Sequence, residues 1–182
     1  MSDVLGLLLA AGAGRRYGSP KVLAHRALWL TTAVDALRCG GCAPVLVVLG
    51  AADAPLPEGA EGVYAQRWPD GIGESLRAGL AAAAAVPGAR YAAVHLVDLP
   101  DVTGDVVTRV IGAATESPAG LARAFFGDRP GHPVVVARRH WTALSDSAHG
   151  DEGGRGYLAR RRGEVVRVQC GDLATGRDQD VP

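Results

Sequence analysis

The residues best able to do chemistry stand in one glycine-rich loop near the N-terminus. Residues 8–21 read Leu-Leu-Ala-Ala-Gly-Ala-Gly-Arg-Arg-Tyr-Gly-Ser-Pro-Lys. Glycines allow a tight turn that brings backbone N–H groups close to an anion, and Arg15, Arg16 and Lys21 add positive charge. The loop is therefore expected to cradle phosphate groups.

This loop matches neither of the two common phosphate-binding motifs. The Walker motif requires Gly-Lys followed by Ser or Thr, whereas Lys21 follows Pro20. The dinucleotide fingerprint has glycines at its first, third and sixth positions, and Gly12, Gly14 and Gly18 span one residue too many. An ordinary strand-to-helix turn with solvated basic residues is the simpler alternative.

A carboxylate follows a later apolar run. The apolar run over residues 91–97 is followed by Asp98, which begins the sequence Asp-Leu-Pro-Asp. A carboxylate at the end of a buried strand would lie at the rim of a sheet, and Mg²⁺ prefers one or two carboxylates with several waters. The alternative is an Asp that closes a turn before proline. Asp101 fits a helix N-cap better, because Val102 and Thr103 open the next helical run.

Two further segments combine glycine with charged residues or histidine. Residues 129–133 read Arg-Pro-Gly-His-Pro, and residues 150–156 read Gly-Asp-Glu-Gly-Gly-Arg-Gly. Arg155 is expected where a helix begins, a favourable place for an anion. The glycines around it predict a lid that orders when substrate binds. A structural role for His132, and an N-cap role for Asp151, are the alternatives.

The elements that would position these residues alternate between strand and helix. We expect strands over 4–9, 44–49, 91–97, 121–126, 133–137 and 165–170, with a short one over 63–65. Helices are expected over 24–37, 73–85, 104–114, 140–145 and 157–161, and a loop or weak element over 51–62. This alternation predicts a mostly parallel sheet covered on both faces, with ligands beyond the carboxyl ends of its strands. The Gly12 loop, Gly50 and Asp98 should share that edge.

Size and composition fit one globular domain. The chain has 182 residues, 48% of them hydrophobic and 21% charged, and 19 basic residues balance 19 acidic ones. This balance argues against a nucleic-acid partner or an acidic membrane surface. We expect no signal peptide and no membrane span, and therefore a cytoplasmic protein. Cys39 and Cys42 have metal-ligand spacing, but zinc would need two more ligands, so a structural role is the simpler interpretation.

Taken in order, these motifs resemble those of the molybdenum-cofactor nucleotidyltransferases, which have a GT-A-like fold, and most of all their CTP:molybdopterin cytidylyltransferase branch. The first loop follows the pattern Leu-Ala-Ala-Gly-x-Gly-x-Arg-x-Gly-x-Pro-Lys. Later matches are Trp-x-x-Gly with Ser-Leu-x-x-Gly over 68–79, Gly-His-Pro over 131–133, Gly-Asp-x-Gly-x-Arg over 150–155 and Asp-x-Asp-Thr-Pro over 178–182. The chain departs from the pattern at Ala65 (commonly Asn), at Val181 (commonly Thr) and after Lys21, where a Gly-Pro-Leu-like turn is missing.

The resemblance implies a single-domain, Rossmann-like α/β three-layer sandwich over residues 1–182, with a mostly parallel central sheet. It implies that Arg16 and Lys21 stabilise the leaving pyrophosphate and that Asp98, with Asp180 or Asp178, binds Mg²⁺. It implies an acceptor site at His132, Asp151 and Arg155. The nucleotide site that it implies consists of Leu9, Ala10, Ala11, Gly12, Ala13, Gly14, Arg15, Arg16, Lys21, Gly71, Ser75 and Asp98.

The implied reaction is Mg²⁺-dependent transfer of CMP from CTP to the phosphate of molybdopterin or the molybdenum cofactor, with release of pyrophosphate. Relatives that use GTP carry Gly where this chain has Ala11, and the extra methyl group narrows the space for a base. A molybdoenzyme that receives the product is a further candidate partner. The alternatives are a related transferase with GTP or another acceptor, and a non-catalytic nucleotide-binding accessory protein.

Overall fold

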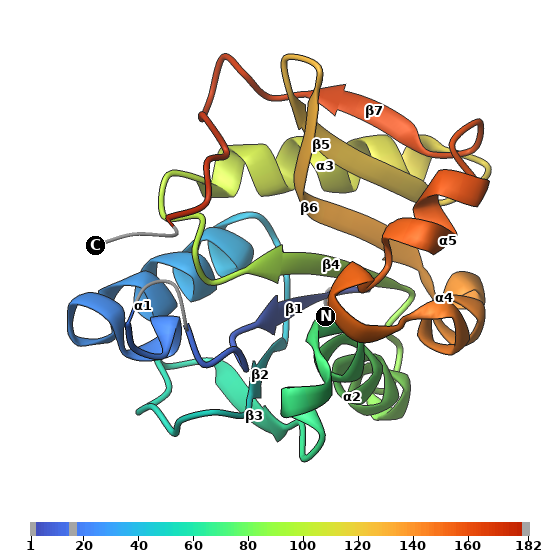
Figure 1. Ribbon diagram of the computed structural model, residues 1–182. Helices are drawn as coiled ribbons and strands as arrows, with labels where there is room; N and C mark the ends of the chain where they lie inside the picture. Colours follow the sequence, from blue (N-terminus) through green and yellow to red (C-terminus); the bar gives the residue numbers. More distant parts are fainter. Residues whose placement is uncertain (1–2, 15–17, 180–182) are drawn as a thin grey trace.

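A seven-stranded sheet forms the centre of the protein. The computed structural model describes residues 3–14 and 18–179, and Figure 1 shows the chain. The sheet has the order β3-β2-β1-β4-β6-β5-β7. Its strands are β1 (Val4–Leu9), β2 (Val45–Leu49), β3 (Ala60–Tyr64), β4 (Tyr91–Leu96), β5 (Leu121–Phe126), β6 (Arg129–Ala137) and β7 (Val166–Gln169).

The sheet is mostly parallel, as expected. β1 lies between β2 and β4 and runs parallel to both, and β3 extends this parallel part beyond β2. β6 runs antiparallel to both of its neighbours, β4 and β5, while β7 is parallel to β5. The two sections of the sheet therefore meet at the pair formed by β4 and β6.

Helices cover both faces of the sheet and make a three-layer sandwich (Figure 1). α1 (Ala24–Cys39) and α3 (Gly104–Glu116) contribute to the apolar core on one face. α2 (Ile72–Ala85), α4 (Trp141–Ser147) and α5 (Arg155–Arg160) contribute to the core on the other. Side chains of β1 alternate between the two cores, so that Leu8 joins the first while Leu7 and Leu9 join the second.

Two expected boundaries differ from the structure by three or more residues. β3 begins at Ala60, inside the stretch expected to be a loop or a weak element, because its backbone pairs with β2 while Glu61 and Tyr64 stay exposed. β6 begins at Arg129, four residues before the expected strand, because the hairpin with β5 extends to Phe126 and Arg129.

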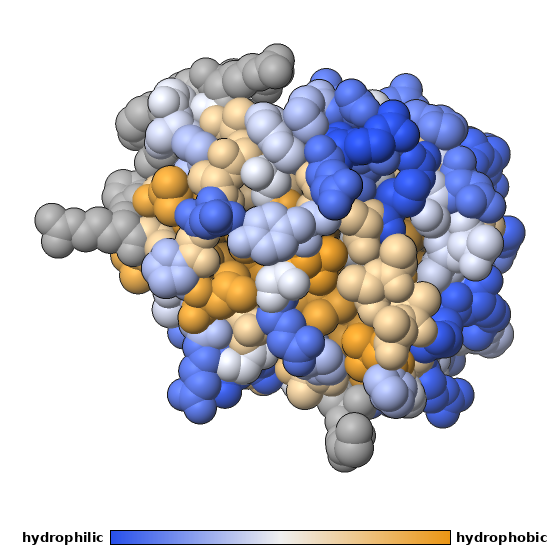
Figure 2. Space-filling model, turned by 90° about the horizontal axis from the view of Figure 1, so that it is seen from below, coloured by the Kyte–Doolittle hydropathy of each residue, from blue (hydrophilic) through white to orange (hydrophobic). Residues whose placement is uncertain are grey.

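The face seen from below borders on β3 and α2. In Figure 2 apolar side chains gather across the middle of this face, with hydrophilic side chains around them. β3 forms this edge of the sheet and pairs only with β2 among the strands that the structure describes. None of the helices in residues 3–14 and 18–179 is long and apolar enough to cross a membrane.

Candidate functional site: two joined cavities

Two cavities open beyond the carboxyl ends of β1 and β4. The first, the Gly12 cavity, has a volume of about 680 Å³ and lies between the N-terminal loop, the turn at Trp68 and the start of α2. The second, the His132 cavity, has a volume of about 270 Å³ and lies against β4, β5 and β6. Their linings share Leu9, Ile72, Leu96, Asp98, Asp151 and Arg155, which we call the junction.

The Gly12 cavity brings together most of the expected nucleotide-binding residues. Its lining includes Leu9, Ala10, Ala11, Gly12, Ala13, Gly14, Lys21, Gly71, Ser75 and Asp98. Trp68 and Pro69 add a wall that the sequence had pointed to through the match over residues 68–79. Arg15, Arg16 and Asp180 lie outside the described residues.

Glycine is required at one point of this loop. Gly14 has a φ of +60°, and a Cβ atom there would lie 1.8 Å from the carbonyl oxygen of Ser19. The N–H of Gly18 donates to the carbonyl of Gly14 at 2.8 Å, which folds the loop back. Lys21 then opens a 3-10 turn, Lys21–Leu23, that leads into α1. The loop therefore returns Lys21 to the edge at which it began.

The ammonium group of Lys21 contacts Asp98. Its Nζ atom lies 2.8 Å from Oδ2 of Asp98, and the two side chains are only 13% and 19% exposed. The other carboxylate oxygen, Oδ1, is buried and has no hydrogen-bond partner within the described part of the chain. A buried, unpaired carboxylate oxygen is a suitable ligand for a hard divalent cation.

No complete metal site is present in residues 3–14 and 18–179. No three side chains of His, Cys, Asp or Glu in these ranges are grouped as metal ligands. Asp178 lines the His132 cavity, as Asp98 does. Cys39 is exposed and Cys42 is buried, and both are free thiols. Burial raises the pKa of Cys42 to about 12.

The start of α2 packs tightly against the Gly150 loop. Gly71 has a φ of +110°, and a Cβ atom there would lie 2.4 Å from the backbone of Gly150. From the next turn of α2, Arg77 donates to the carbonyl oxygens of Ala148 at 2.6 Å and Ser145 at 3.3 Å. These contacts hold the Gly150 loop beside the Gly12 cavity and place Asp151 at the junction.

The N-cap role considered for Asp151 is wrong. Asp151 lies in the 3-10 turn Gly150–Glu152, and the residue at the N-cap of α5 is Gly154. Arg155 begins α5, as expected, and lines both cavities. The structure thus brings Asp151 and Arg155 together with Asp98 at the junction.

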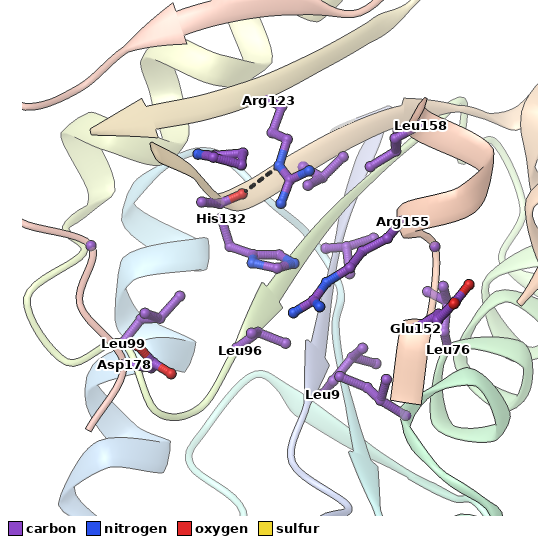
Figure 3. A pocket seen from close by; sticks show the side chains of 18 of the residues that line it. Leu9, Leu76, Leu96, Leu99, Arg123, His132, Glu152, Arg155, Leu158 and Asp178 are labelled. Carbon is purple, nitrogen blue, oxygen red and sulfur yellow. Dashed lines mark hydrogen bonds between the residues drawn. The ribbon is translucent and has the colours of Figure 1, made fainter. Parts of the chain in front are cut away.

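The His132 cavity has an aliphatic lining with a few polar groups (Figure 3). The aliphatic side chains include Leu76, Val94, Leu96, Leu99, Val134, Val136, Leu144 and Leu158. His132 points into this space. Burial, followed by the positive charges of Arg123, His95 and Arg155, lowers the pKa of His132 to about 3. His132 is therefore neutral at pH 7 and can offer a hydrogen bond without adding charge.

Arg123 is a cavity residue that the sequence analysis missed. It projects from β5 into the His132 cavity, and its Nε atom donates to the carbonyl of Gly131 at 3.0 Å. The pairing of β5 with β6 shifts register between Arg123 and Phe125, a local irregularity of the kind that redirects side chains. A signal was available, since Arg123 is the one charged residue in the run Leu-Ala-Arg-Ala-Phe-Phe.

Asp101 has a role that was not expected. The residue at the N-cap of α3 is Thr103, so Asp101 does not cap this helix. Its Oδ2 atom instead accepts hydrogen bonds from Thr175 N at 2.7 Å, Thr175 Oγ1 at 2.5 Å and Gly176 N at 3.2 Å. Farther along, Gln179 N donates to the carbonyl of Asp98 at 3.0 Å. Residues 175–179 are thereby fastened along the site, where Gly176 and Asp178 line the His132 cavity.

A glycine-rich loop after β1, a carboxylate after β4 and two cavities that meet between them define an α/β enzyme that joins a nucleotide to a second ligand. The comparison with protein families gives the same class. The chain belongs to the MobA-like NTP transferase domain family, whose model matches residues 6–165. The expectation of a nucleotidyltransferase of this family is therefore confirmed.

Two curated relatives are similar over nearly the whole chain. Nicotine blue oxidoreductase of Paenarthrobacter nicotinovorans is 34% identical, over 97% of this chain and 92% of that protein. The bifunctional enzyme IspD/IspF of Caulobacter vibrioides is also 34% identical, over 94% of this chain. The match covers 49% of IspD/IspF, so this chain spans about half of that enzyme.

Solved structures confirm the fold. Rv0371c from Mycobacterium tuberculosis has a TM-score of 0.80 at 25% identity, over 98% of this chain and 94% of that one. The same protein was solved in complex with manganese, with a TM-score of 0.76 at 24% identity, over 98% of this chain and 94% of that one. The 2-C-methyl-D-erythritol 4-phosphate cytidylyltransferase of Thermus thermophilus has a TM-score of 0.69 at 21% identity, over 96% of this chain and 91% of that one.

Proposed function

We propose that this protein transfers CMP from CTP to the phosphate of molybdopterin or of the molybdenum cofactor and releases pyrophosphate, with residues 1–182 acting as one catalytic domain. One observation carries the proposal. The two cavities share a junction that contains Asp98 and Arg155. A nucleotide in the Gly12 cavity and an acceptor in the His132 cavity would meet there. The cytoplasmic setting stays a prediction.

In the proposed reaction an oxygen of the acceptor phosphate attacks the α-phosphorus of CTP. The bond from that phosphorus to the bridging oxygen of the β-phosphate breaks, and its electron pair leaves with pyrophosphate. The backbone N–H groups of the Gly12 loop and the ammonium group of Lys21 stabilise the leaving charge, with Arg16 in the same role. Arg155 orients the acceptor phosphate. Positioning and charge stabilisation supply most of the catalysis in such reactions.

A divalent cation fits the carboxylate at the junction. The unpaired Oδ1 of Asp98 would hold Mg²⁺, with Asp180 or Asp178 as a second ligand, and the bound cation would neutralise charge on the phosphates. The manganese complex of Rv0371c supports a divalent cation in this fold.

The choice of CTP depends on the space beside Ala11. A Cβ atom on Gly50 would lie 2.9 Å from Cβ of Ala11 and 2.6 Å from Cγ of Trp68. Ala11, Gly50 and Trp68 are thus closely packed on one side of the Gly12 cavity. This wall favours the smaller pyrimidine base. The cytidylyltransferases among the similar solved structures support the same choice.

The experiment that tests the proposal is calorimetric binding of CTP and GTP, each with and without Mg²⁺. We expect CTP to bind more tightly than GTP and Mg²⁺ to strengthen its binding. Pyrophosphate release should then depend on adding molybdopterin. Tighter binding of GTP would overturn the choice of nucleotide, and CTP binding without pyrophosphate release would favour the accessory-protein alternative.

A second candidate is a redox enzyme built on the same cavities. The observation that favours it is the 34% identity, over 97% of this chain, to a protein named an oxidoreductase. In this case a redox cofactor with a nucleotide portion would occupy the Gly12 cavity, although the loop departs from the dinucleotide fingerprint, and an organic substrate would occupy the His132 cavity. In the test, the protein is added to NADPH while the fluorescence of NADPH is followed. A change in fluorescence that neither CTP nor GTP reverses would favour this candidate. Displacement of CTP by pyrophosphate would favour the transferase.

A further inference from the structure

Three arginines line the His132 cavity, and one of them, Arg129, donates from Nη2 to the carbonyl of Thr175 at 2.6 Å. The other two guanidinium groups project into the cavity from different walls. Arg123 extends from β5, and Arg155 extends from the start of α5, with His132 beside them (Figure 3). Arg155 also lines the Gly12 cavity, whereas Arg123 lines only the His132 cavity. Arg123 thus lies on the side of Arg155 that faces away from the nucleotide.

Carboxylates among the described residues line the same cavity at Asp98, Asp151, Glu152 and Asp178, but none of them pairs with either guanidinium. No carboxylate within residues 3–14 and 18–179 forms an ion pair with Arg123 or Arg155, although six other ion pairs occur there. Burial, followed by the positive charge of Arg155, lowers the pKa of Arg123. An arginine remains charged under these conditions, so the repulsion persists until an anion enters.

The orientation of Arg123 is fixed by one hydrogen bond. Its Nε atom donates to the carbonyl of Gly131 at 3.0 Å across the β5–β6 hairpin. The terminal Nη groups have no hydrogen-bond partner in the described part of the chain and face the cavity. A guanidinium held in this way presents its remaining N–H donors in a planar fork that matches two oxygens of one phosphate.

We propose that Arg123 and Arg155 together bind a dianionic phosphate monoester, and that Arg123 makes the site selective for the dianion over singly charged groups. The inference rests on the acceptor role proposed above for the His132 cavity. Two positive charges match a group with two negative charges, and the aliphatic lining accommodates an apolar body attached to it. His132 is neutral and adds a hydrogen bond without a further positive charge.

The phosphate held by this pair has a defined relation to the nucleotide. Because Arg155 reaches the junction and Arg123 does not, the phosphate lies with one side toward the Gly12 cavity. An oxygen on that side is the one available for attack. Arg123 is therefore a specificity-determining residue on the acceptor side and has no contact with the nucleotide.

The test uses phenyl phosphate and its methyl ester as probes of the whole protein. The two probes share an aromatic body, but the ester carries one negative charge. We expect the wild-type protein to bind phenyl phosphate more tightly than the ester. Arg123→Gln should weaken phenyl phosphate binding by roughly 10- to 100-fold, as expected for the loss of hydrogen bonds to a charged group. Binding of the ester should change much less.

Two further variants separate charge and geometry from folding. Arg123→Lys keeps the charge and loses the fork, so it should restore part of the phenyl phosphate affinity. Arg162→Gln removes the same charge from an exposed position near α5 and should leave binding of both probes unchanged. Equal binding of the two probes by the wild-type protein would overturn the proposal, and so would wild-type affinity in Arg123→Gln.

Binding of CTP tells apart the failure of this inference and the failure of the proposed function. Arg123→Gln should bind CTP as the wild-type protein does, because Arg123 does not line the Gly12 cavity. A wild-type protein that binds CTP but does not prefer phenyl phosphate over its methyl ester would overturn only the role of Arg123. Selective binding of phenyl phosphate without binding of CTP would support the role of Arg123 and overturn the proposed cytidylyltransferase activity.

Discussion

Lys21 Nζ and Asp98 Oδ2 lie 2.8 Å apart at the edge of the sheet, although 77 residues separate them in the sequence. The sequence assigned these residues to two different ligands, a leaving pyrophosphate and a metal ion. Here Lys21 Nζ pairs with Oδ2 of Asp98, while Oδ1 of Asp98 has no hydrogen-bond partner within the described residues. Substrate binding would exchange this internal pair for two external ones, a phosphate for Lys21 and a cation for Asp98.

Replacement of Asp98 should abolish turnover more than it affects folding. Asp98→Ala removes the carboxylate at the junction and leaves Lys21 without this partner, so we expect kcat to fall by roughly 100-fold or more at saturating Mg²⁺. Pyrophosphate release measures the effect. Asp128→Ala is the matched control, because Asp128 is fully exposed in the β5–β6 turn. Near-wild-type turnover of Asp98→Ala would show that Asp98 is not the metal ligand.

A methyl group added at Gly50 should lower the stability of the protein and weaken nucleotide binding in the Gly12 cavity. A Cβ atom there would meet Trp68 at 2.6 Å and Ala11 at 2.9 Å, so Gly50→Ala must displace the Trp68 wall. We expect a loss of about 1–3 kcal/mol in the free energy of unfolding, together with weaker CTP binding by calorimetry. Gly112→Ala is the control, since nothing lies within 4 Å of its added Cβ atom and α3 should become slightly more stable. Unchanged CTP affinity in Gly50→Ala would mean that Trp68 does not contribute to nucleotide binding.

The hydrogen bonds from Asp101 should hold residues 175–179 in place. Asp101→Ala removes the acceptor for three donors, Thr175 N, Thr175 Oγ1 and Gly176 N. We expect faster amide hydrogen exchange in this segment and a higher KM for the acceptor, because Gly176 and Asp178 line the His132 cavity. Asp146→Ala, at an exposed position of α4, should change neither. Exchange that stays slow in Asp101→Ala would mean that other contacts hold the segment.

Stability should fall in mild acid because of two histidines. Burial is the main cause that lowers the pKa of His132 to about 3 and that of His95 to about 4, from the ordinary value of 6.5. The unfolded chain therefore takes up protons below pH 6.5 that the folded protein does not. The contribution to stability is complete above pH 6.5 and is lost as the pH falls toward 4 and 3.

Urea unfolding between pH 7 and pH 4 measures this loss. The free energy of unfolding should decline less steeply in His132→Gln than in the wild-type protein. His149→Gln changes an exposed histidine and serves as the control. Parallel profiles for the wild-type protein and His132→Gln would contradict the low pKa of His132.

The strands that consist mostly of apolar residues could be predicted most closely. β1 and β5 have the expected bounds, because every residue of β1 and all of β5 except Arg123 are apolar. β3 could not be read in the same way, since its pairing with β2 depends on backbone groups and Glu61 and Tyr64 are exposed. The antiparallel insertion of β6 between β4 and β5 depends on tertiary packing that no local pattern encodes.

Within the site, the sequence predicted which residues belong there better than it predicted which residues they contact. Asp98 and Lys21 were both singled out, yet their contact follows from the adjacency of β1 and β4, which lie far apart in the chain. Asp101 looked like a helix cap because its partners, Thr175 and Gly176, are more than seventy residues away. Arg123 was missed because it lies in a mostly apolar strand, and its role depends on its position across the cavity from Arg155, which no local pattern shows.

The antiparallel pairing of β4 with β6 separates two sections of the sheet, and each section supports a different cavity. Strands β3, β2, β1 and β4 support the Gly12 cavity, whereas the continuous stretch from β5 to α5 supplies Arg123, His132 and Arg155. Under the proposed function, substitutions confined to that one stretch and outside the junction would change the acceptor that the protein takes and leave the Gly12 cavity as it is.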